Sequence, residues 1–353
     1  MAPRPRLLGI ATAVPSFVMD QADVARVTAE LFGGSDTDFE KFVPVYANAA
    51  IKTRYSCVSL DWYTRAHGLQ ERNALFIENA VNLLEQAADR ALLQAGLGRA
   101  DVDAVVAVST SGIATPSLDA LIIERMQLRP DVERLPVFGL GCVGGVTGLA
   151  RAGQMACSRP GTNVLLLVVE LCGLTFRHQD RSKSNIIATA LFGDGAAAAI
   201  IRSDAGVADR APVITAWGEH TWPDTLGIMG WTVEDDGLGV LFSRSIPALI
   251  RRDYRPALDR FLQTNDLTLA AIDHFAIHPG GAKVVNALEE SLGFEPGHLS
   301  DSRAILKAYG NMSAATVLFV LERILKEPGP PGQILLSSLG PGFTAGFLVL
   351  EAL

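Results

Sequence analysis

Residues 141–153 read Gly-Cys-Val-Gly-Gly-Val-Thr-Gly-Leu-Ala-Arg-Ala-Gly, and this stretch decides the fold. It predicts a helix of small residues that begins at Cys142. An apolar strand, residues 104–109, is opened by Asp103, 39 residues before Cys142, and a buried strand, residues 164–169, begins 22 residues after it. Apolar strands that alternate with helical stretches are typical of parallel sheets covered by helices.

The second half of the chain repeats this order. Asp273 opens a short strand, Asn311 follows 38 residues later before a helical stretch, and a strand begins at Ile334, 23 residues after Asn311. Each half then closes on a glycine-punctuated strand, residues 193–201 and 340–350. Other α/β proteins space their strands similarly, but three landmarks in register favour an internal repeat. The interpretation is an α/β fold of two related halves, residues 1–205 and 206–353, packed face to face.

The repeat also predicts a site. Cys142 and Asn311 would hold equivalent positions at helix N-termini near a pseudo-twofold axis, and His278 would end a strand of the second half. Ligands of α/β proteins favour the carboxyl ends of parallel strands. We therefore expect these three side chains to converge on one site.

Composition excludes several classes of protein. The 353 residues are 49% apolar, which excludes a disordered chain, and the net charge of −8 argues against a nucleic-acid or anionic-membrane partner. The apolar run 164–169 is six residues long, whereas a membrane span needs about 20. The N-terminal residues 1–15 predict a first strand rather than a signal peptide. We expect a cytoplasmic protein without disulfides, and the four cysteines and six histidines form no metal-ligand pattern.

Cys142 is the candidate nucleophile. The N–H groups and dipole of a helix N-terminus stabilise an anion, and such placement can lower the pKa of a thiol below its usual value of about 8.5. For Cys57, Cys157 and Cys172 the simpler reading is a buried small hydrophobe. The same stretch also matches the dinucleotide-binding pattern Gly-x-Gly-x-x-Gly over residues 139–144, with Glu170 as its acidic residue, so an NAD-binding dehydrogenase is a competing hypothesis.

The other two candidates each have an ordinary alternative. His278 ends an apolar strand before Pro279-Gly280-Gly281, and a histidine in such a strand is usually a satisfied core residue. Asn311 stands at a helix start, where asparagine is a favoured N-cap. Only the constellation of the three raises them to catalytic candidates.

At these residues the chain resembles the type III polyketide synthases, the chalcone-synthase-like branch of the thiolase-fold condensing enzymes. The resemblance covers nearly the whole chain, and the segments 220–225 and 229–231 resemble the bacterial branch. Its most specific motifs are Gly141-Cys142-x-Gly144-Gly145, Leu191-Phe192-Gly193-Asp194-Gly195, His278-Pro279-Gly280-Gly281, Tyr309-Gly310-Asn311-Met312-Ser313 and Gly340-Pro341-Gly342.

The resemblance implies a thiolase-like fold with a layered αβαβα architecture. It also implies that Cys142 accepts an acyl group from acyl-CoA, and that His278 and Asn311 complete a triad that supports decarboxylative condensation with malonyl-CoA. Two hydrogen-bond donors at the enolate oxygen can each contribute on the order of 3 kcal/mol. Asparagine suits this role better than aspartate, because a carboxylate would repel the enolate.

Further residues carry over by position. Phe192 and Phe242 resemble the family's gating phenylalanines. Four hydroxyl side chains fall at cavity-lining positions, although each could equally bond to buried backbone: Thr110, Ser111, Thr175 and Ser313. The candidates for coenzyme A binding are Lys41, Lys52 and Arg54, and for Arg54 a structural ion pair competes. Pro44 and Asn48 stand where the family has further basic residues, and Ser338-Leu339 replaces the plant enzymes' Gly-Phe.

The resemblance further implies a homodimer that uses coenzyme A thioesters as substrates, with no cofactor and no metal. Several bacterial members take fatty acyl starters, which favours an alkylpyrone or alkylresorcinol product. Three alternatives remain: a carrier-protein-dependent 3-ketoacyl synthase of the same fold, the NAD-binding dehydrogenase, and a non-catalytic acyl-binding homologue.

Overall fold

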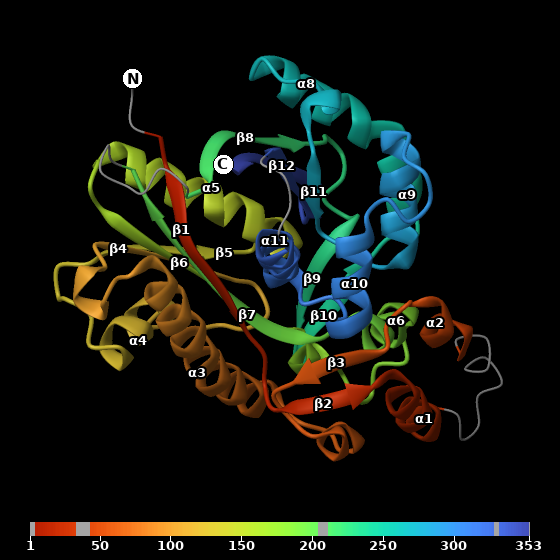
Figure 1. Ribbon diagram of the computed structural model, residues 1–353. Coiled ribbons are helices and arrows are strands. Elements are labelled where there is room, and N and C mark those ends of the chain that lie inside the picture. Colours follow the sequence, from red (N-terminus) through yellow and green to blue (C-terminus); the bar gives the residue numbers. More distant parts are fainter. Residues whose placement is uncertain (1–3, 33–42, 204–210, 328–331, 353) are drawn as a thin grey trace.

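The computed structural model describes residues 4–32, 43–203, 211–327 and 332–352. Its largest element is a nine-stranded mixed sheet in the order β11-β12-β13-β8-β1-β7-β6-β4-β5 (Figure 1). The strands of this sheet are β1 (Arg6–Ala13), β4 (Ala104–Ser109), β5 (Glu133–Phe138), β6 (Asn163–Leu171), β7 (Asp194–Arg202), β8 (Val213–Thr221), β11 (His274–Ile277), β12 (Gly332–Gly340) and β13 (Thr344–Ala352).

The internal repeat is visible in this strand order. The first half contributes β1-β7-β6-β4, the second half contributes β8-β13-β12-β11, and β5 extends only the first half. In both halves the first two pairs are antiparallel and the third pair is parallel. The two halves meet where β1 pairs with β8 through Arg6 and Val213.

Two aspartates open equivalent strands with the same hydrogen bonds. Asp103 and its strand β4 meet the first residue of β6, because the N–H of Asn163 donates to Asp103 Oδ2 at 2.8 Å. The N–H of Gln333 in β12 donates to Asp273 Oδ2 at the same distance of 2.8 Å. The aspartates therefore fix the register of both halves, and Val108 and His278 lie at matching positions five residues after them.

Helices divide the molecule into layers. One outer layer covers the first half, a central layer lies between the halves, and a second outer layer covers the second half (Figure 1). The helices are α1 (Gln21–Phe32), α2 (Val43–Asn48), α3 (Leu69–Ala95), α4 (Leu118–Arg125), α5 (Gly144–Ser158), α6 (Lys183–Leu191), α7 (Ile246–Leu249), α8 (Arg255–Thr264), α9 (Ala282–Leu292), α10 (Ser300–Tyr309) and α11 (Thr316–Lys326).

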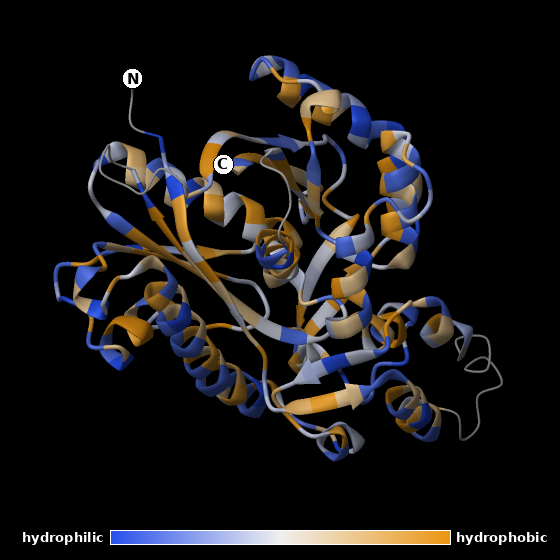
Figure 2. Ribbon diagram, viewed as in Figure 1, coloured by the Kyte–Doolittle hydropathy of each residue, from blue (hydrophilic) through white to orange (hydrophobic). Residues whose placement is uncertain are grey.

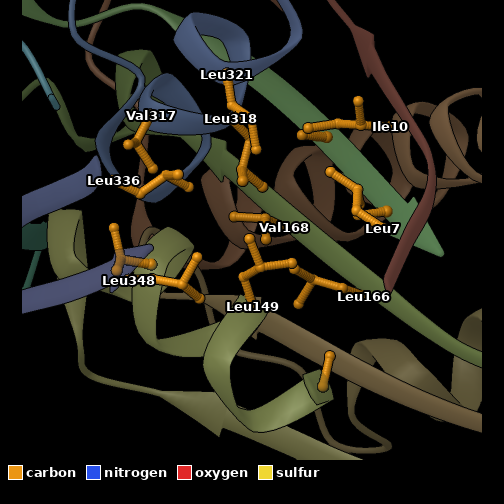
Figure 3. Close-up of a cluster of buried hydrophobic side chains, with 14 of the residues drawn as sticks. Leu7, Ile10, Leu149, Leu166, Val168, Val317, Leu318, Leu321, Leu336 and Leu348 are labelled. Atoms are coloured by element: carbon orange, nitrogen blue, oxygen red, sulfur yellow. The ribbon is translucent and has the colours of Figure 1, made fainter. Parts of the chain in front are cut away.

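The central layer consists of α5 and α11. Their apolar side chains meet those of the sheet in one core, in which Leu149 of α5, Leu318 of α11 and Val168 of β6 are completely buried (Figure 3). A Cβ atom on Gly145 would lie 2.2 Å from the carbonyl oxygen of Ala314, so glycine is required where the two helical segments approach each other. The small residues of 141–153 thus serve a close helix–helix contact.

The outer helices carry polar residues on their solvent side (Figure 2). Helices α3 and α4 cover the first half through a second core, and α8 and α9 cover the second half through a third. The layers therefore alternate helix, sheet, helix, sheet, helix, as the layered α/β expectation required. The sheet is mixed rather than parallel, because the closing strand of each half, β7 or β13, runs antiparallel to both of its neighbours.

Two small antiparallel sheets lie outside the large one. Strands β2 (Phe17–Asp20) and β3 (Thr53–Ser56), which α1 and α2 separate in sequence, form one pair, and β9 (Met229–Glu234) and β10 (Gly237–Phe242) form the other as a hairpin. Within the part of the chain that the structure describes, no helix is both long and apolar enough to cross a membrane.

Candidate active site

A cavity of about 660 Å³ has Cys142, His278 and Asn311 in its wall. The three side chains are buried, with 7%, 4% and 1% of their surface exposed, so they lie at the floor rather than at the mouth. They come from a turn before α5, the residue after β11 and the segment between α10 and α11. The fold therefore brings together the three residues that the repeat had singled out.

The turn that carries Cys142 is held from three sides. Gly141 has a φ of +50° and is the first residue of the 3-10 turn Gly141–Val143 that leads into α5. Its N–H donates to Thr110 Oγ1 at 2.9 Å, and the hydroxyl of Ser338 donates to the carbonyl of Cys142 at 2.6 Å. A Cβ on residue 141 would lie 2.6 Å from the ring of Pro341. Glycine is therefore required one residue before the nucleophile.

The structural equivalent of Cys142 is not Asn311. Helix α11 also follows a 3-10 turn, Ser313–Ala315, whose first residue, Ser313, has a φ of +46° like that of Gly141. Superposing the turns pairs Cys142 with Ala314, and Asn311 precedes the equivalent of Gly141 by two residues. The predicted equivalence is wrong by three residues, because the spacing of strands leaves the intervening loop free to differ in length.

The protonation of Cys142 also differs from expectation. Burial raises the pKa of the thiol to about 12, and this effect exceeds the lowering by hydrogen bonds from Ser313 and Asn311. The predicted lowering of the pKa at a helix N-terminus is therefore overcome, because the cavity floor removes the thiolate from water. The raised pKa favours the thiol form of Cys142, so formation of the thiolate requires a base.

His278 is the candidate for that base, because it lines the same cavity as Cys142. Its backbone N–H donates to the carbonyl of Ser337 at 2.8 Å, which continues the parallel pairing of β11 with β12. Neither ring nitrogen has a hydrogen-bond partner among the described residues. Burial lowers the pKa of His278 to about 3, so the ring is neutral and offers one N–H donor and one acceptor. A buried imidazole with both nitrogens unpaired is suited to bond with a reacting group in the cavity.

The carboxamide of Asn311 is fixed at both ends. Its Oδ1 accepts the N–H of Ser313 at 2.8 Å, and its Nδ2 donates to the carbonyl of Gly280 at 3.1 Å. An amide nitrogen carries two hydrogens, so the second can bond to the Cys142 sulfur or to a ligand beside it. The side chain acts partly as the local cap that the sequence suggested, and it also presents a fixed donor to the cavity.

Glu170 is an acid near the site whose position there the sequence did not reveal. Its Oε2 accepts the N–H groups of Thr110 and Ser111 at 3.1 and 2.9 Å, its side chain is completely buried, and burial raises its pKa to about 7. Its negative charge contributes to raising the pKa of Cys142. The signal that could have found it is an acid within an otherwise apolar strand. A carboxylate enclosed in this way is not available to a nucleotide ribose, which removes the support for the dinucleotide fingerprint.

Phe192 and Phe242 separate two cavities. Their ring centroids are 5.8 Å apart; Phe242 lines the large cavity, whereas Phe192 lines a smaller one of about 60 Å³. Thr175 and Cys172 line the smaller cavity with Phe192. This position between two cavities suits a gating pair, which stays a prediction.

The hydroxyls predicted to line a cavity are engaged with the protein. Thr110 accepts from Gly141, Ser111 Oγ accepts the N–H of Leu171 at 2.9 Å, and Thr175 donates to the carbonyl of Cys172 at 2.7 Å. Ser313 is hydrogen-bonded to Cys142 and is the one closest to the reacting sulfur. The alternative of bonding to buried backbone thus describes Thr110, Ser111 and Thr175.

Of the three residues predicted to bind coenzyme A, neither of the two that the structure describes lines the large cavity. Lys41 lies outside the described residues. Lys52 is exposed and does not line the large cavity, whereas Arg54 is 3% exposed and donates to the carbonyls of Ala190 and Phe192 at 3.1 and 3.0 Å. Arg54 is therefore corrected to a structural residue, because carbonyls at the end of α6 already hold its guanidinium. Three cations that the sequence analysis did not name line the cavity instead: Lys183, Arg244 and Lys283.

Comparison with known proteins identifies the family of the chain. Residues 2–205 match the family model of the N-terminal domain of chalcone and stilbene synthases, and residues 215–353 match the model of their C-terminal domain. The chain is 38% identical to a 1,3,6,8-tetrahydroxynaphthalene synthase of Streptomyces peucetius, with 96% of this chain and 91% of that protein covered.

Solved structures lead to the same family. PKS-I of the brown alga Ectocarpus siliculosus superposes with a TM-score of 0.93 at 26% identity, over 100% of this chain and 99% of that one. The 1,3,6,8-tetrahydroxynaphthalene synthase of Streptomyces coelicolor gives 0.90 at 25% identity, over 98% and 99% of the two chains. The thiolase-like fold is confirmed, and the chain belongs to the chalcone and stilbene synthase family as a type III polyketide synthase, an acyl-transferring condensing enzyme.

Proposed function

We infer that the enzyme loads an acyl group from acyl-CoA onto Cys142, extends it with malonyl-CoA by repeated decarboxylative condensation, and cyclises the product. The observation that carries this proposal is the single cavity with a buried thiol, an unpartnered neutral imidazole and a fixed carboxamide in its wall. Acyl transfer to a thiol needs the first two groups, and decarboxylation to an enolate needs the last two.

In the loading step one proton moves from Cys142 to His278 and then to the departing coenzyme A thiolate. The thiol of Cys142 gives its proton to His278, and the thiolate attacks the thioester carbon of acyl-CoA. The carbon–sulfur bond to coenzyme A then breaks, and the leaving thiolate takes the proton from His278. The pKa values of about 12 and about 3 make the separated ions unfavourable, so we expect proton transfer and attack to be closely coupled.

In the condensing step His278 and Asn311 stabilise the negative charge of an enolate. Malonyl-CoA loses carbon dioxide, and the electron pair of the broken bond forms the enolate of acetyl-CoA. The enolate oxygen accepts hydrogen bonds from His278 and from Asn311 Nδ2. The carbanion then attacks the acyl carbon on Cys142, the bond to sulfur breaks, and the elongated chain leaves on coenzyme A. Burial strengthens both hydrogen bonds because water is excluded.

We propose an aliphatic starter and an alkylpyrone or alkylresorcinol product. Aliphatic side chains at the cavity floor support this choice, since an alkyl chain gains about 0.8 kcal/mol for each CH₂ that leaves water. They are Ile277, Leu288 and Leu339.

A second candidate is the formation of 1,3,6,8-tetrahydroxynaphthalene. It is favoured by the 38% identity to a Streptomyces peucetius protein of that name. The two candidates differ in the need for an acyl-CoA starter other than malonyl-CoA. Dependence on a carrier protein, the third alternative, would appear as a lack of product from free coenzyme A esters.

The assembly and location are part of the same proposal. We expect a homodimer formed at β5, because this strand is one of the two edges of the large sheet and its Phe138 side chain is 63% exposed. Ile113, which is 48% exposed, adds to the apolar surface. Unpaired sheet edges with apolar side chains associate readily. We expect a cytoplasmic enzyme that needs no cofactor beyond its thioester substrates.

The first experiment is intact-mass analysis with acyl-CoA esters from acetyl to palmitoyl, each with and without malonyl-CoA. We expect an acyl adduct that maps to Cys142 and is converted to pyrones or resorcinols when malonyl-CoA is added. Product from malonyl-CoA alone, with no preference for fatty acyl esters, would support the naphthalene product instead. The absence of an adduct with every ester would overturn the covalent mechanism.

A further inference from the structure

The wall of the large cavity includes three cations, but none of them comes from α2. Pro44 and Asn48 of α2 are exposed and uncharged, at positions where the family resemblance predicted cations. Lys183, Arg244 and Lys283 line the same cavity and are also exposed. They come from the start of α6, the link between β10 and α7, and the start of α9. The cations that line this cavity therefore come from α6, α9 and the link between β10 and α7 rather than from α2.

The two lysines among these cations occupy electrostatically unfavourable positions in their helices. Lys183 is the first residue of α6 and Lys283 is the second residue of α9, and neither helix has an acidic residue in its first turn. The N-terminus of a helix carries a partial positive charge, so a lysine there is electrostatically disfavoured. A bound anion would reverse the sign of this interaction for both the helix and the lysine.

Two of these cations are available to a ligand. Neither the side chain of Arg244 nor that of Lys283 forms an ion pair or hydrogen bond with another described residue, whereas Lys183 already has an interaction partner. Arg244 follows Phe242 by two residues, and Lys283 follows His278 by five. The same cavity continues from these cations to the unpartnered nitrogens of His278. A ligand with phosphates at one end and a thioester at the other fits this arrangement.

We propose that Arg244 and Lys283 bind the phosphate groups of coenzyme A and replace the cations that are missing at residues 44 and 48. This inference rests on the proposed function, because the thioester must reach Cys142. Arginine supplies a planar set of N–H donors for phosphate oxygens and lysine supplies a point charge. Arg244 and Lys283 thus make the enzyme prefer thioesters that carry the coenzyme A phosphates to thioesters without phosphate.

The test compares substrates with and without the nucleotide. Arg244→Gln, Lys283→Gln and the double variant are assayed with the acyl-CoA that the wild type accepts and with the matching acyl-N-acetylcysteamine thioester, which has no phosphate. We expect KM for acyl-CoA to rise about 3- to 5-fold for each charge removed, as for exposed ion pairs, with kcat unchanged. KM for the phosphate-free thioester should stay constant. The rise should shrink at 0.5 M salt, where screening is strong.

The control is Arg260→Gln, which removes an exposed charge on α8 away from the cavity and should leave both KM values unchanged. Equal rises in KM for both thioesters would overturn the proposal, since the effect would then not involve phosphate. An unchanged KM for acyl-CoA in the double variant would also overturn it. Failure of the proposed function would look different, because the wild type would then form no product from either thioester.

Discussion

The two turns before α5 and α11 have the same backbone but different chemistry. Gly141 and Ser313 are both left-handed, and each begins a 3-10 turn that continues into a central helix. In the first turn the next residue is the proposed nucleophile Cys142, whereas in the second it is Ala314, which lies close to Gly144 and Gly145. The two halves of the fold therefore supply two equivalent turns. One turn carries the proposed nucleophile, and the other turn packs against the first.

The strands that face these turns differ in the same way. Val108 in β4 is a core residue that lies over Gly144 and Gly148, while His278 at the matching position after β11 lines the cavity. In the proposed mechanism one half therefore supplies the nucleophile and the other supplies the base and the amide. The asymmetry lies in side chains and not in the fold, so single substitutions can test it.

Cys142→Ala should have the largest effect. It makes the first turn resemble the second, where alanine stands at this position, and it removes the only proposed acyl acceptor. Polyketide formation should fall by more than about 10³-fold, as for other enzymes that lose their nucleophile. Product analysis with malonyl-CoA and the preferred starter measures this, with unchanged thermal unfolding as the control for folding. Condensation that persists would contradict the assignment.

Asn311→Ala should separate loading from condensation. The change removes the donor Nδ2 and the acceptor of the Ser313 N–H. Loss of one donor at a developing oxyanion costs about 10²- to 10³-fold in rate. We expect that loss in malonyl-CoA decarboxylation, while intact mass still detects the acyl adduct on Cys142. If loading and decarboxylation fell equally, Asn311 would act on the cysteine rather than on the enolate.

His278→Val copies the residue that the first half has at this register. The wild-type His278 pKa of about 3 lies below its unfolded value of about 6.5, so the unfolded chain binds more protons between these values. The wild type therefore loses stability from this group as pH falls through 6.5 toward 3. We expect the variant to lack activity but to lose less stability between pH 7.5 and 5.5.

Urea unfolding at these two pH values measures the difference. Since neither ring nitrogen has a hydrogen-bond partner among the described residues, the substitution breaks no such bond. A parallel pH dependence in both proteins would show that His278 is not buried as a neutral ring.

Gly141→Ala and Ser313→Gly should change stability in different ways. The alanine meets Pro341 at 2.6 Å and adopts a φ of +50°, which costs about 1–2 kcal/mol for the backbone alone. The glycine relieves that backbone cost at residue 313 but loses the serine hydroxyl. We expect a clear drop in the urea midpoint for the first variant and a change within about 1 kcal/mol for the second. Equal losses would show that the two turns are not conformationally equivalent.

The sequence predicted much of this architecture. The two aspartates, the spacing of the strands and the glycine motifs predicted a repeated α/β fold, and the structure confirms it. These features are local, since hydrophobic periodicity and turn residues act over a few positions. Residues 278 and 311 were also found as candidates, because the repeat placed a strand-end histidine and a helix-start asparagine together with Cys142.

Other properties depended on tertiary structure. The pKa of Cys142 was expected to be low from its place before a helix, but enclosure between the two halves raises it. Arg54 was expected at the coenzyme A site, but its guanidinium reaches carbonyls at the end of α6, more than 130 positions away. The three-residue difference between Asn311 and Ala314, the structural equivalent of Cys142, likewise depended on the length of the loop before α11.

The sequence alone therefore predicted the order of elements, the repeat and three candidate catalytic residues that the fold brings to one cavity. Only the tertiary structure decided their protonation, the equivalence of the turns and which cations surround the cavity. The reason is physical: periodicity and turn propensity are encoded in neighbouring residues, whereas burial and charge proximity arise when distant segments meet.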